Sequence, residues 1–409
     1  MMRACGIVLA VIAALGLAPD AGAEETQLKL HGYATLGAVY HDTQGVVYRR
    51  DISQSTAGAQ AGQLAFTPDS MLAVQADYRD GDDWFATAQV VSRQDADNTF
   101  RPQLALANVG YRAGATHLHL GRMLLDMYLE GDAAEIGYAN DMVRQPNVYF
   151  PRYIDGVGGD WTQPLGHGLL RWHGQAGWVT GTLVSNGAPY DTSGSATQDI
   201  GVDYLHADWT VRLSAGQSFL KRQTPDLQAG GAFDQALSAV PNRTQLLNKF
   251  SMAGRRISNR VFALGYDGAA CRAQAGYTVF VSPYTPMQKY AYLRGAWRMG
   301  AVTPYAAYVK RWAARDFVGT GIPDGLSSQT DQLNVAISNG EAALLFNQYE
   351  VALGMRYDFM ADYALKLQWE HIRFQDSQTL VDAHAAATSA QTRGFRNMNL
   401  YSLTLDMLF

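Results

Sequence analysis

Apolar and polar residues alternate with a period of two over long stretches of this chain. From Asn399 to Phe409 the odd positions are mostly apolar, whereas Ser402 and Asp406 fall between them. The segment 349–359 repeats the pattern, which resumes at Tyr363 after the short link 360–362. Because successive side chains of a β-strand point to opposite faces, each segment is predicted to be a strand with one apolar and one polar face.

The links between these segments are of two kinds. Seven are short turns, at 80–83, 113–115, 164–168, 206–208, 267–269, 299–300 and 360–362. Between them lie long polar stretches, among them 41–69, 123–155, 181–198, 220–258 and 313–347. In a soluble β-sandwich, short and long loops are not expected to lie at opposite ends of the strands. A transmembrane barrel, in contrast, has short turns on its periplasmic rim and long loops on its extracellular rim. With both termini at the periplasmic rim, n strands need n/2 − 1 short turns, so seven turns predict sixteen strands.

The predicted fold is all-β: a transmembrane antiparallel β-barrel of sixteen strands with short periplasmic turns and long extracellular loops. Strands of about ten residues suit a tilted crossing of the hydrocarbon layer. We expect them at residues 28–40, 70–79, 84–93, 104–112, 116–122, 156–163, 169–180, 199–205, 209–219, 259–267, 270–281, 289–298, 301–312, 348–359, 363–375 and 397–409.

Aromatic residues cluster near the ends of the predicted strands. In a barrel they would form the girdle at the membrane interface, and in a sandwich they would fill the core. They include Trp84, Tyr111, Trp209, Tyr266, Tyr357, Phe359, Tyr363 and Phe409.

Composition narrows the class further. The chain has 409 residues, of which 17% are charged, and it contains no run of eighteen apolar residues that could form a membrane-spanning helix. Arg3, the apolar stretch 6–17 and the small residues 21–23 predict a cleaved export signal over residues 1–23, followed by the barrel over 24–409. The remaining segment holds one thiol, Cys271, so neither an internal disulfide nor a cysteine metal cluster is expected.

The balance of charge bears on the partners. The 32 basic residues, mostly Arg, face 37 acids, which gives a net charge of −5 with both signs spread along the chain. This distribution speaks against nucleic acid as a partner. A barrel of this kind would contact outer-membrane lipid and lipopolysaccharide.

Several motifs, taken in their order along the chain, resemble the sixteen-stranded porins of Gram-negative bacteria over essentially the whole exported segment. They are the opening strand at 30–37, the second strand from Asp69 to Val74, Leu120-Gly121-Arg122 and the terminal Phe409. The resemblance implies a homotrimer, a third long loop folded into the barrel, and recognition of Phe409 by the outer-membrane assembly machinery. The usual loop tip of the family is absent, and Arg144-Gln145-Pro146-Asn147 resembles the divergent, substrate-selective members.

A barrel of sixteen strands is wide enough to leave an aqueous lumen. By strand parity the face that would line it carries eleven cations, Lys29, Arg79, Arg93, Arg112, Arg171, Arg212, Arg272, Arg294, Arg298, Arg356 and Lys366. The same face carries six acids, Asp77, Asp203, Glu350, Asp358, Glu370 and Asp406. For any single arginine the alternative role is a salt bridge that holds the inner wall rigid.

Together the charges are predicted to act as a field. Arg79, Arg93 and Arg112 fall on adjacent strands, and the third long loop supplies acids that would face them if it folds into the lumen. We expect a water-filled channel for small hydrophilic solutes, anionic or zwitterionic, since Arg can bind a carboxylate through two hydrogen bonds. The expected pore-lining and constriction residues are Arg79, Arg93, Arg112, Glu130, Asp132, Glu135, Asp141, Arg171, Arg212, Arg272, Arg294 and Arg356.

Two other functions stay open, an outer-membrane hydrolase and a non-conducting adhesin barrel. His117 and His119 share one strand face, but no carboxylate or thiol is spaced nearby in the sequence to complete a metal site. The chain has no Gly-x-Ser-x-Gly, no His-Glu-x-x-His and no phosphate-binding loop. The sequence therefore favours a channel over an enzyme, with no cofactor and no metal.

Overall fold

The computed structural model describes residues 26–55, 57–146, 152–185, 188–223, 232–282, 286–314, 317–343, 347–374, 381–382, 385–387 and 397–409. The predicted export signal at 1–23 and Asn147 lie outside these ranges.

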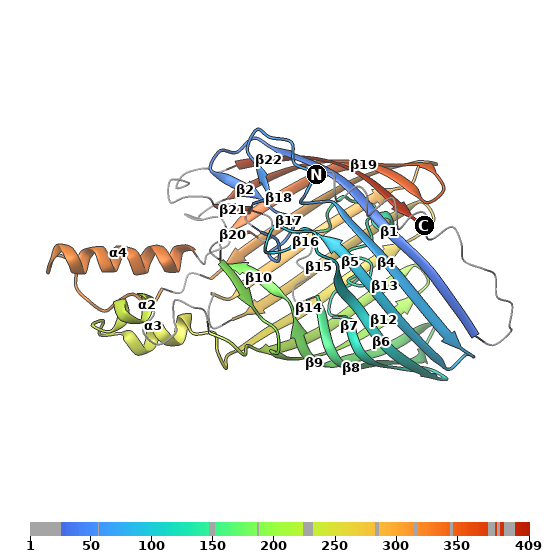
Figure 1. Cartoon of the computed structure of the whole chain (residues 1–409), viewed down its shortest axis with the longest axis horizontal. Helices are drawn as coiled ribbons and strands as arrows, with labels where there is room; N and C mark the ends of the chain where they lie inside the picture. Colours follow the sequence, from blue (N-terminus) through green and yellow to red (C-terminus); the bar gives the residue numbers. More distant parts are fainter. Residues whose placement is uncertain are drawn as a thin grey trace.

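Sixteen antiparallel strands close into a barrel, in the order β1-β22-β19-β18-β17-β16-β15-β14-β13-β12-β9-β8-β7-β6-β5-β4 (Figure 1). The fold class, the strand number and the alternation of short and long links are thus confirmed. Every predicted strand coincides with an observed one, with ends that differ by at most three residues. The strands are β1 (Thr26–His41), β4 (Met71–Asp80), β5 (Trp84–Arg93), β6 (Gln103–Ala113), β7 (Thr116–Leu124), β8 (Tyr153–Leu165), β9 (Gly168–Thr180), β12 (Ala196–His206), β13 (Trp209–Phe219), β14 (Arg256–Asp267), β15 (Cys271–Val281), β16 (Gln288–Trp297), β17 (Val302–Ala313), β18 (Gln348–Met360), β19 (Tyr363–Phe374) and β22 (Asn397–Leu408).

The two faces of the barrel wall have the polarity expected in a membrane. On β22, Tyr401 and Leu403 are 47% and 44% exposed, whereas Ser402 between them is 2% exposed. On β19, Leu367 is 55% exposed beside the fully buried Gln368. Apolar side chains therefore face outward and polar side chains face inward, the reverse of a soluble sandwich.

Aromatic pairs mark the short-turn end of the wall. Trp84 packs against Tyr111 on the neighbouring strand, and Trp209 packs against Tyr266, each with ring centroids 4.8 Å apart. Both tryptophans are about half exposed, at 53% and 46%. Side chains of this kind, apolar with a polar edge, suit the boundary between hydrocarbon and water.

The terminal residue takes part in closing the barrel. The Gly32 amide donates to the Phe409 carbonyl oxygen at 2.7 Å, and the Phe409 amide donates back to the Gly32 carbonyl at 3.1 Å. A Cβ at position 32 would lie 2.6 Å from the Phe409 ring and 2.5 Å from the Ala73 carbonyl oxygen. Only glycine leaves room for the ring at this point.

The long stretches at the other end carry secondary structure that alternation did not predict. Helices α2 (Ala232–Leu237), α3 (Arg243–Phe250) and α4 (Ser328–Ala343) project beyond the strands (Figure 1) and share a small apolar core around Leu237, Leu246 and Ile337. No helix in the described part of the chain is long and apolar enough to cross a membrane. The short elements are β2 (Val46–Tyr48), β3 (Ala59–Gln60), β10 (Thr182–Ser185), β11 (Ala188–Asp191), β20 (Val381–Asp382), β21 (Ala385–Ala387) and the 3-10 turn η1 (Gly137–Ala139).

Candidate functional site

The segment between β7 and β8 is here called loop three, and its described residues 125–146 fold inside the barrel. The Val143 amide donates to the Gln368 side-chain oxygen at 2.9 Å, and Gln368 lies on the inward face of β19. The Lys366 ammonium, on the same face, donates to the Gly137 carbonyl and pairs with Asp406 of β22 at 3.0 Å. Loop three therefore reaches the wall opposite its own strands, as expected from the resemblance.

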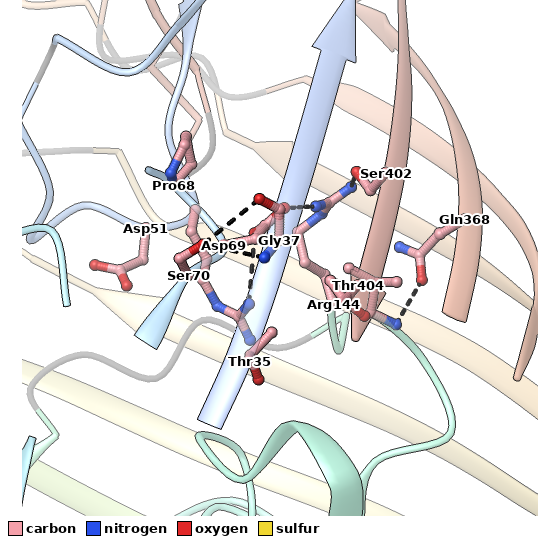
Figure 2. Close-up of polar contacts among 12 residues, drawn as sticks. Thr35, Gly37, Asp51, Pro68, Asp69, Ser70, Arg144, Gln368, Ser402 and Thr404 are labelled. Atoms are coloured by element: carbon pink, nitrogen blue, oxygen red, sulfur yellow. Dashed lines mark hydrogen bonds and ion pairs between the residues drawn. The ribbon is translucent and has the colours of Figure 1, made fainter. Parts of the chain in front are cut away.

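Arg144 anchors the far side of loop three (Figure 2). Its guanidinium donates to Asp69 at 2.7 Å, to the Ser402 hydroxyl at 2.6 Å and to both carboxylate oxygens of Glu370. The three charged side chains are at most 5% exposed. The guanidinium also lies 5.1 Å from the centre of the Tyr48 ring. A buried charge is tolerated only when it is paired and hydrogen-bonded, and this arginine meets both conditions.

Glu135 joins loop three to the near wall. It pairs with Arg93 of β5 and with Arg152 at 3.1 Å, and accepts a hydrogen bond from the Tyr153 hydroxyl at 2.6 Å. Burial would raise the pKa of Glu135, but the two arginine charges and the hydrogen bonds outweigh it and lower this pKa from 4.5 to about 2. The carboxylate is therefore ionised at neutral pH.

Two further acids of loop three meet arginines of β15 and β16. Glu130 pairs with Arg272 at 3.2 Å and with Arg294, and Asp141 lies 3.5 Å from Arg272. Asp126, which the sequence did not single out, pairs with Arg212 of β13 at 2.8 Å and with Arg171 of β9 at 3.1 Å. These arginines also fulfil the alternative role of bracing the inner wall.

Arg356 of β18 holds the tip of the loop. It donates to the carbonyl oxygens of Tyr138 and Asn140 at 2.5 and 3.0 Å, and pairs with Asp358 at 2.7 Å. Its guanidinium stacks 4.6 Å from the centre of the Tyr138 ring. The arrangement fixes the loop through backbone oxygens as well as through charge.

The expectation that Arg79, Arg93 and Arg112 jointly face loop three is wrong for two of the three. Arg79 of β4 pairs in register with Phe85 of β5. Arg93 lies eight residues beyond Phe85 on β5, a distance of about 26 Å along the strand. Arg112 lies two residues beyond Gly110, the partner of Phe85, toward the short-turn end. The alternation of side chains along each strand correctly places all three arginines on one face, but it carries no information about their positions along the barrel axis. Only Arg93 meets loop three.

One acid of loop three stays exposed. Asp132 is exposed, and its side chain accepts a hydrogen bond from the neighbouring Ala133 amide at 2.9 Å. Among the described residues no ion pair to Asp132 is formed. Its carboxylate is therefore available to solvent.

The histidines of the lumen have partners that sequence spacing could not reveal. His117 lies 3.2 Å from Asp160 of β8, and His173 lies 3.5 Å from Asp126 and 3.9 Å from Asp203. No group of three or more His, Cys, Asp or Glu side chains in the described ranges is arranged to hold a metal ion. The histidines belong to the polar lining of the wall.

Comparison with known proteins supports the fold. No family model matches the chain, and no curated protein matches it. Among solved structures it is similar to outer-membrane-expressed OmpT of Vibrio cholerae, with a TM-score of 0.55 and 10% identity over 95% of this chain and 99% of that one.

Two further similar structures are those of proteins named as a channel and a porin. The outer membrane channel DcaP of Acinetobacter baumannii gives a TM-score of 0.54 and 11% identity, covering 96% of this chain and all of that one. The anion-selective porin from Comamonas acidovorans gives a TM-score of 0.53 and 12% identity, covering 94% of this chain and all of that one. Together with the apolar outer surface, these likenesses identify an outer-membrane β-barrel protein of sixteen strands.

Proposed function

We propose that the protein is a porin that forms a water-filled channel for passive diffusion of small hydrophilic solutes, anionic or zwitterionic. The observation that carries this proposal is the polarity of the barrel interior. Barrels of sixteen strands generally enclose more space than inward side chains fill. The inward face of this barrel is lined by arginines and acids. Burying so many charged side chains in a sealed core would cost free energy, whereas around a water-filled lumen they stay hydrated.

The pairing of charges supports a preference for zwitterions over simple anions. Arg171 is 32% exposed and lies within 3.5 Å of three acids, and Arg272 is 20% exposed between Glu130 and Asp141. A solute that carries both signs can exchange with such pairs, whereas a simple anion meets a carboxylate beside each guanidinium. The proposed selective lining is therefore centred on Arg171, Arg212, Arg272, Arg294 and the acids of loop three, with Arg79 and Arg112 nearer the periplasmic mouth.

We further propose a homotrimer in contact with lipopolysaccharide and other outer-membrane lipid, delivered after removal of residues 1–23 and recognised by the assembly machinery through Phe409. A catalytic role is not proposed, because His117 and His173 lie beside acids along the wall and no specific geometry among the described residues favours a hydrolase.

Liposome swelling tests the proposal directly. Purified protein should admit small zwitterionic amino acids faster than dicarboxylates of similar size, and both faster than a disaccharide. Swelling indistinguishable from that of protein-free liposomes would indicate the non-conducting adhesin alternative. Hydrolysis of ester or peptide substrates by the same preparation would instead support the enzyme.

A further inference from the structure

Two histidines lie close together at the short-turn end of the wall. His167 belongs to the two-residue turn between β8 and β9, and His206 is the last residue of β12. Because β9 and β12 are paired as far as Leu169 and Leu205, the turn that precedes β9 lies beside the end of β12. The ring centres of the two imidazoles are 6.5 Å apart, and both residues are exposed. The two rings can therefore reach the same ligand in solution.

Tight turns fix the backbone beneath both rings. Gly166, the first residue of the turn between β8 and β9, has a φ of +59°, and Ala207, directly after His206, has a φ of +50°. Both values lie in the left-handed region that two-residue hairpin turns require. The strands on either side of each turn are paired up to the turn itself. The separation of the two imidazoles is thus set by the barrel, apart from the rotation of their side chains.

A hydrogen bond determines which nitrogen of His206 is free. Its Nδ1 lies 3.1 Å from the carbonyl oxygen of His167. Because a carbonyl oxygen can only accept, Nδ1 carries the hydrogen, and the lone pair of the neutral ring is on Nε2. Histidines that bind metals commonly show this arrangement, in which the other ring nitrogen donates to a backbone carbonyl. The Tyr204 ring, stacked on His206 at an interplanar angle of 16°, limits rotation of the imidazole.

The two rings differ from the histidines of the lumen in their electrostatic surroundings. His117, for example, lies 3.2 Å from Asp160. In the part of the chain that the structure describes, no carboxylate lies within ion-pair distance of His167 or His206. The Nε2 atom of His206 and the ring nitrogens of His167 are therefore available to an external ligand.

Neutral imidazole nitrogens favour a particular class of ligand. They bind Cu²⁺, Ni²⁺ and Zn²⁺, whereas Ca²⁺ and Mg²⁺ prefer oxygen. Metal–nitrogen bonds of about 2.0–2.1 Å place the ring centres of two histidines on one tetrahedral ion roughly 5 Å apart. The two rings thus need to approach each other by about 1.5 Å. Rotation of the His167 side chain supplies this approach, because the residue lies at an exposed turn between Gly166 and Gly168.

We propose that His167 and His206 bind a divalent transition-metal ion, Cu²⁺ in preference to Zn²⁺, at the periplasmic rim of the barrel. Water fills the remaining coordination positions, because no third His, Cys, Asp or Glu side chain within the described ranges is grouped with the pair. Copper is preferred because the affinity of nitrogen sites for divalent ions is highest at Cu²⁺. His206 shares the outward face of β12 with the exposed Ile200, so the site lies outside the lumen and does not depend on the channel function.

The test is titration of the untagged protein in detergent micelles with Cu²⁺, followed by electron paramagnetic resonance. Wild type should bind one ion per chain and show two coordinating nitrogens. His167→Gln and His206→Gln should each bind at least about tenfold more weakly, since even the loss of an outer partner of a metal ligand costs about 10–100-fold in affinity. The matched control His31→Gln removes a partly exposed imidazole that lies beside Asp77, and it should bind as wild type.

Further arms separate this site from other ways of holding copper. Zn²⁺ should compete with Cu²⁺, whereas Ca²⁺ and Mg²⁺ should not. Tyr204→Phe, which keeps the stacked ring, should bind as wild type. Heat-dependent mobility on gels shows that each variant is folded, and the ion conductance of His206→Gln should equal that of wild type, so that failure of this site is distinct from failure of the channel.

Several results would overturn the proposal. They are the absence of Cu²⁺ binding by wild type, a spectrum with a single coordinating nitrogen, and undiminished affinity in both histidine variants. Effective competition by Ca²⁺ would do the same, because it would indicate oxygen ligands. An ion shared between two copies of the chain, detected as a Cu²⁺-dependent increase in the molar mass of the protein particle, would also contradict a site built from His167 and His206 of one chain.

Discussion

Replacing Arg144 with Met should loosen loop three by an amount that buried-charge energetics can predict. The guanidinium, 4% exposed, is the main partner of Glu370 and one of two partners of Asp69. Its removal leaves Glu370 buried without its cation, and breaking a buried pair from one side costs about 3–5 kcal/mol. Asp69 keeps Arg50 at 3.4 Å, which places the expected loss near the lower end of that range.

The assay is urea-dependent unfolding in lipid vesicles, followed by tryptophan fluorescence, with Arg101→Met as the matched control. Arg101 is 64% exposed and pairs with Asp97, which is 61% exposed, so its loss should leave the free energy of unfolding unchanged. Single-channel recordings should show larger current fluctuations for Arg144→Met, because the far side of loop three has lost its anchor. Equal unfolding free energies for the two variants would refute the assignment of Arg144 as that anchor.

Two further outcomes follow from the same structure. The pKa of Glu135 is lowered from 4.5 to about 2, so the stability that its carboxylate contributes is complete above pH 4.5 and is lost as the pH falls through about 2. The difference in unfolding free energy between wild type and Glu135→Gln should therefore stay constant from pH 7 to 4.5 and shrink only as the pH approaches 2, and a loss of this difference near pH 4.5 would contradict the pairing with Arg93 and Arg152. Gly32→Ala should impair barrel closure, because the new Cβ would lie 2.6 Å from the Phe409 ring. The control Gly295→Ala, whose Cβ meets nothing nearer than 3.9 Å, should fold normally. Heat-dependent mobility on gels reports closure, and equal folded fractions of the two variants would argue against the Phe409 contact.

The sequence was sufficient for the barrel because the strand pattern is local. Leu367 is 55% exposed and its neighbour Gln368 is fully buried, and exposed and buried positions alternate in the same way along much of β13, β17 and β22. The helices of the long loops escaped prediction because the apolar residues that join them, Leu246 and Ile337, lie in separate stretches that alternation marks only as polar.

The ion pairs escaped prediction for a different reason. Arg144 and Glu370 are 226 positions apart, and no periodicity links a loop residue to the strand it meets. The alternation of side chains predicts that Arg79 and Arg93 share one face of the wall. It does not predict the register of the strands, and this register separates the two residues by most of the height of the wall. The acids of loop three were identified as candidates because a folded-in loop was expected from the family resemblance.

Passage of water and solutes through the barrel alongside loop three can be tested with engineered cysteines. Asp132→Cys on a Cys271→Ser background places a thiol on the exposed part of the loop, and Leu403→Cys places one on the lipid face. A charged, water-soluble thiol reagent added during single-channel recording should step the current of the Asp132→Cys channel and leave that of Leu403→Cys unchanged. A barrel that carries no current, or an Asp132→Cys current that the reagent never alters, would contradict the claim.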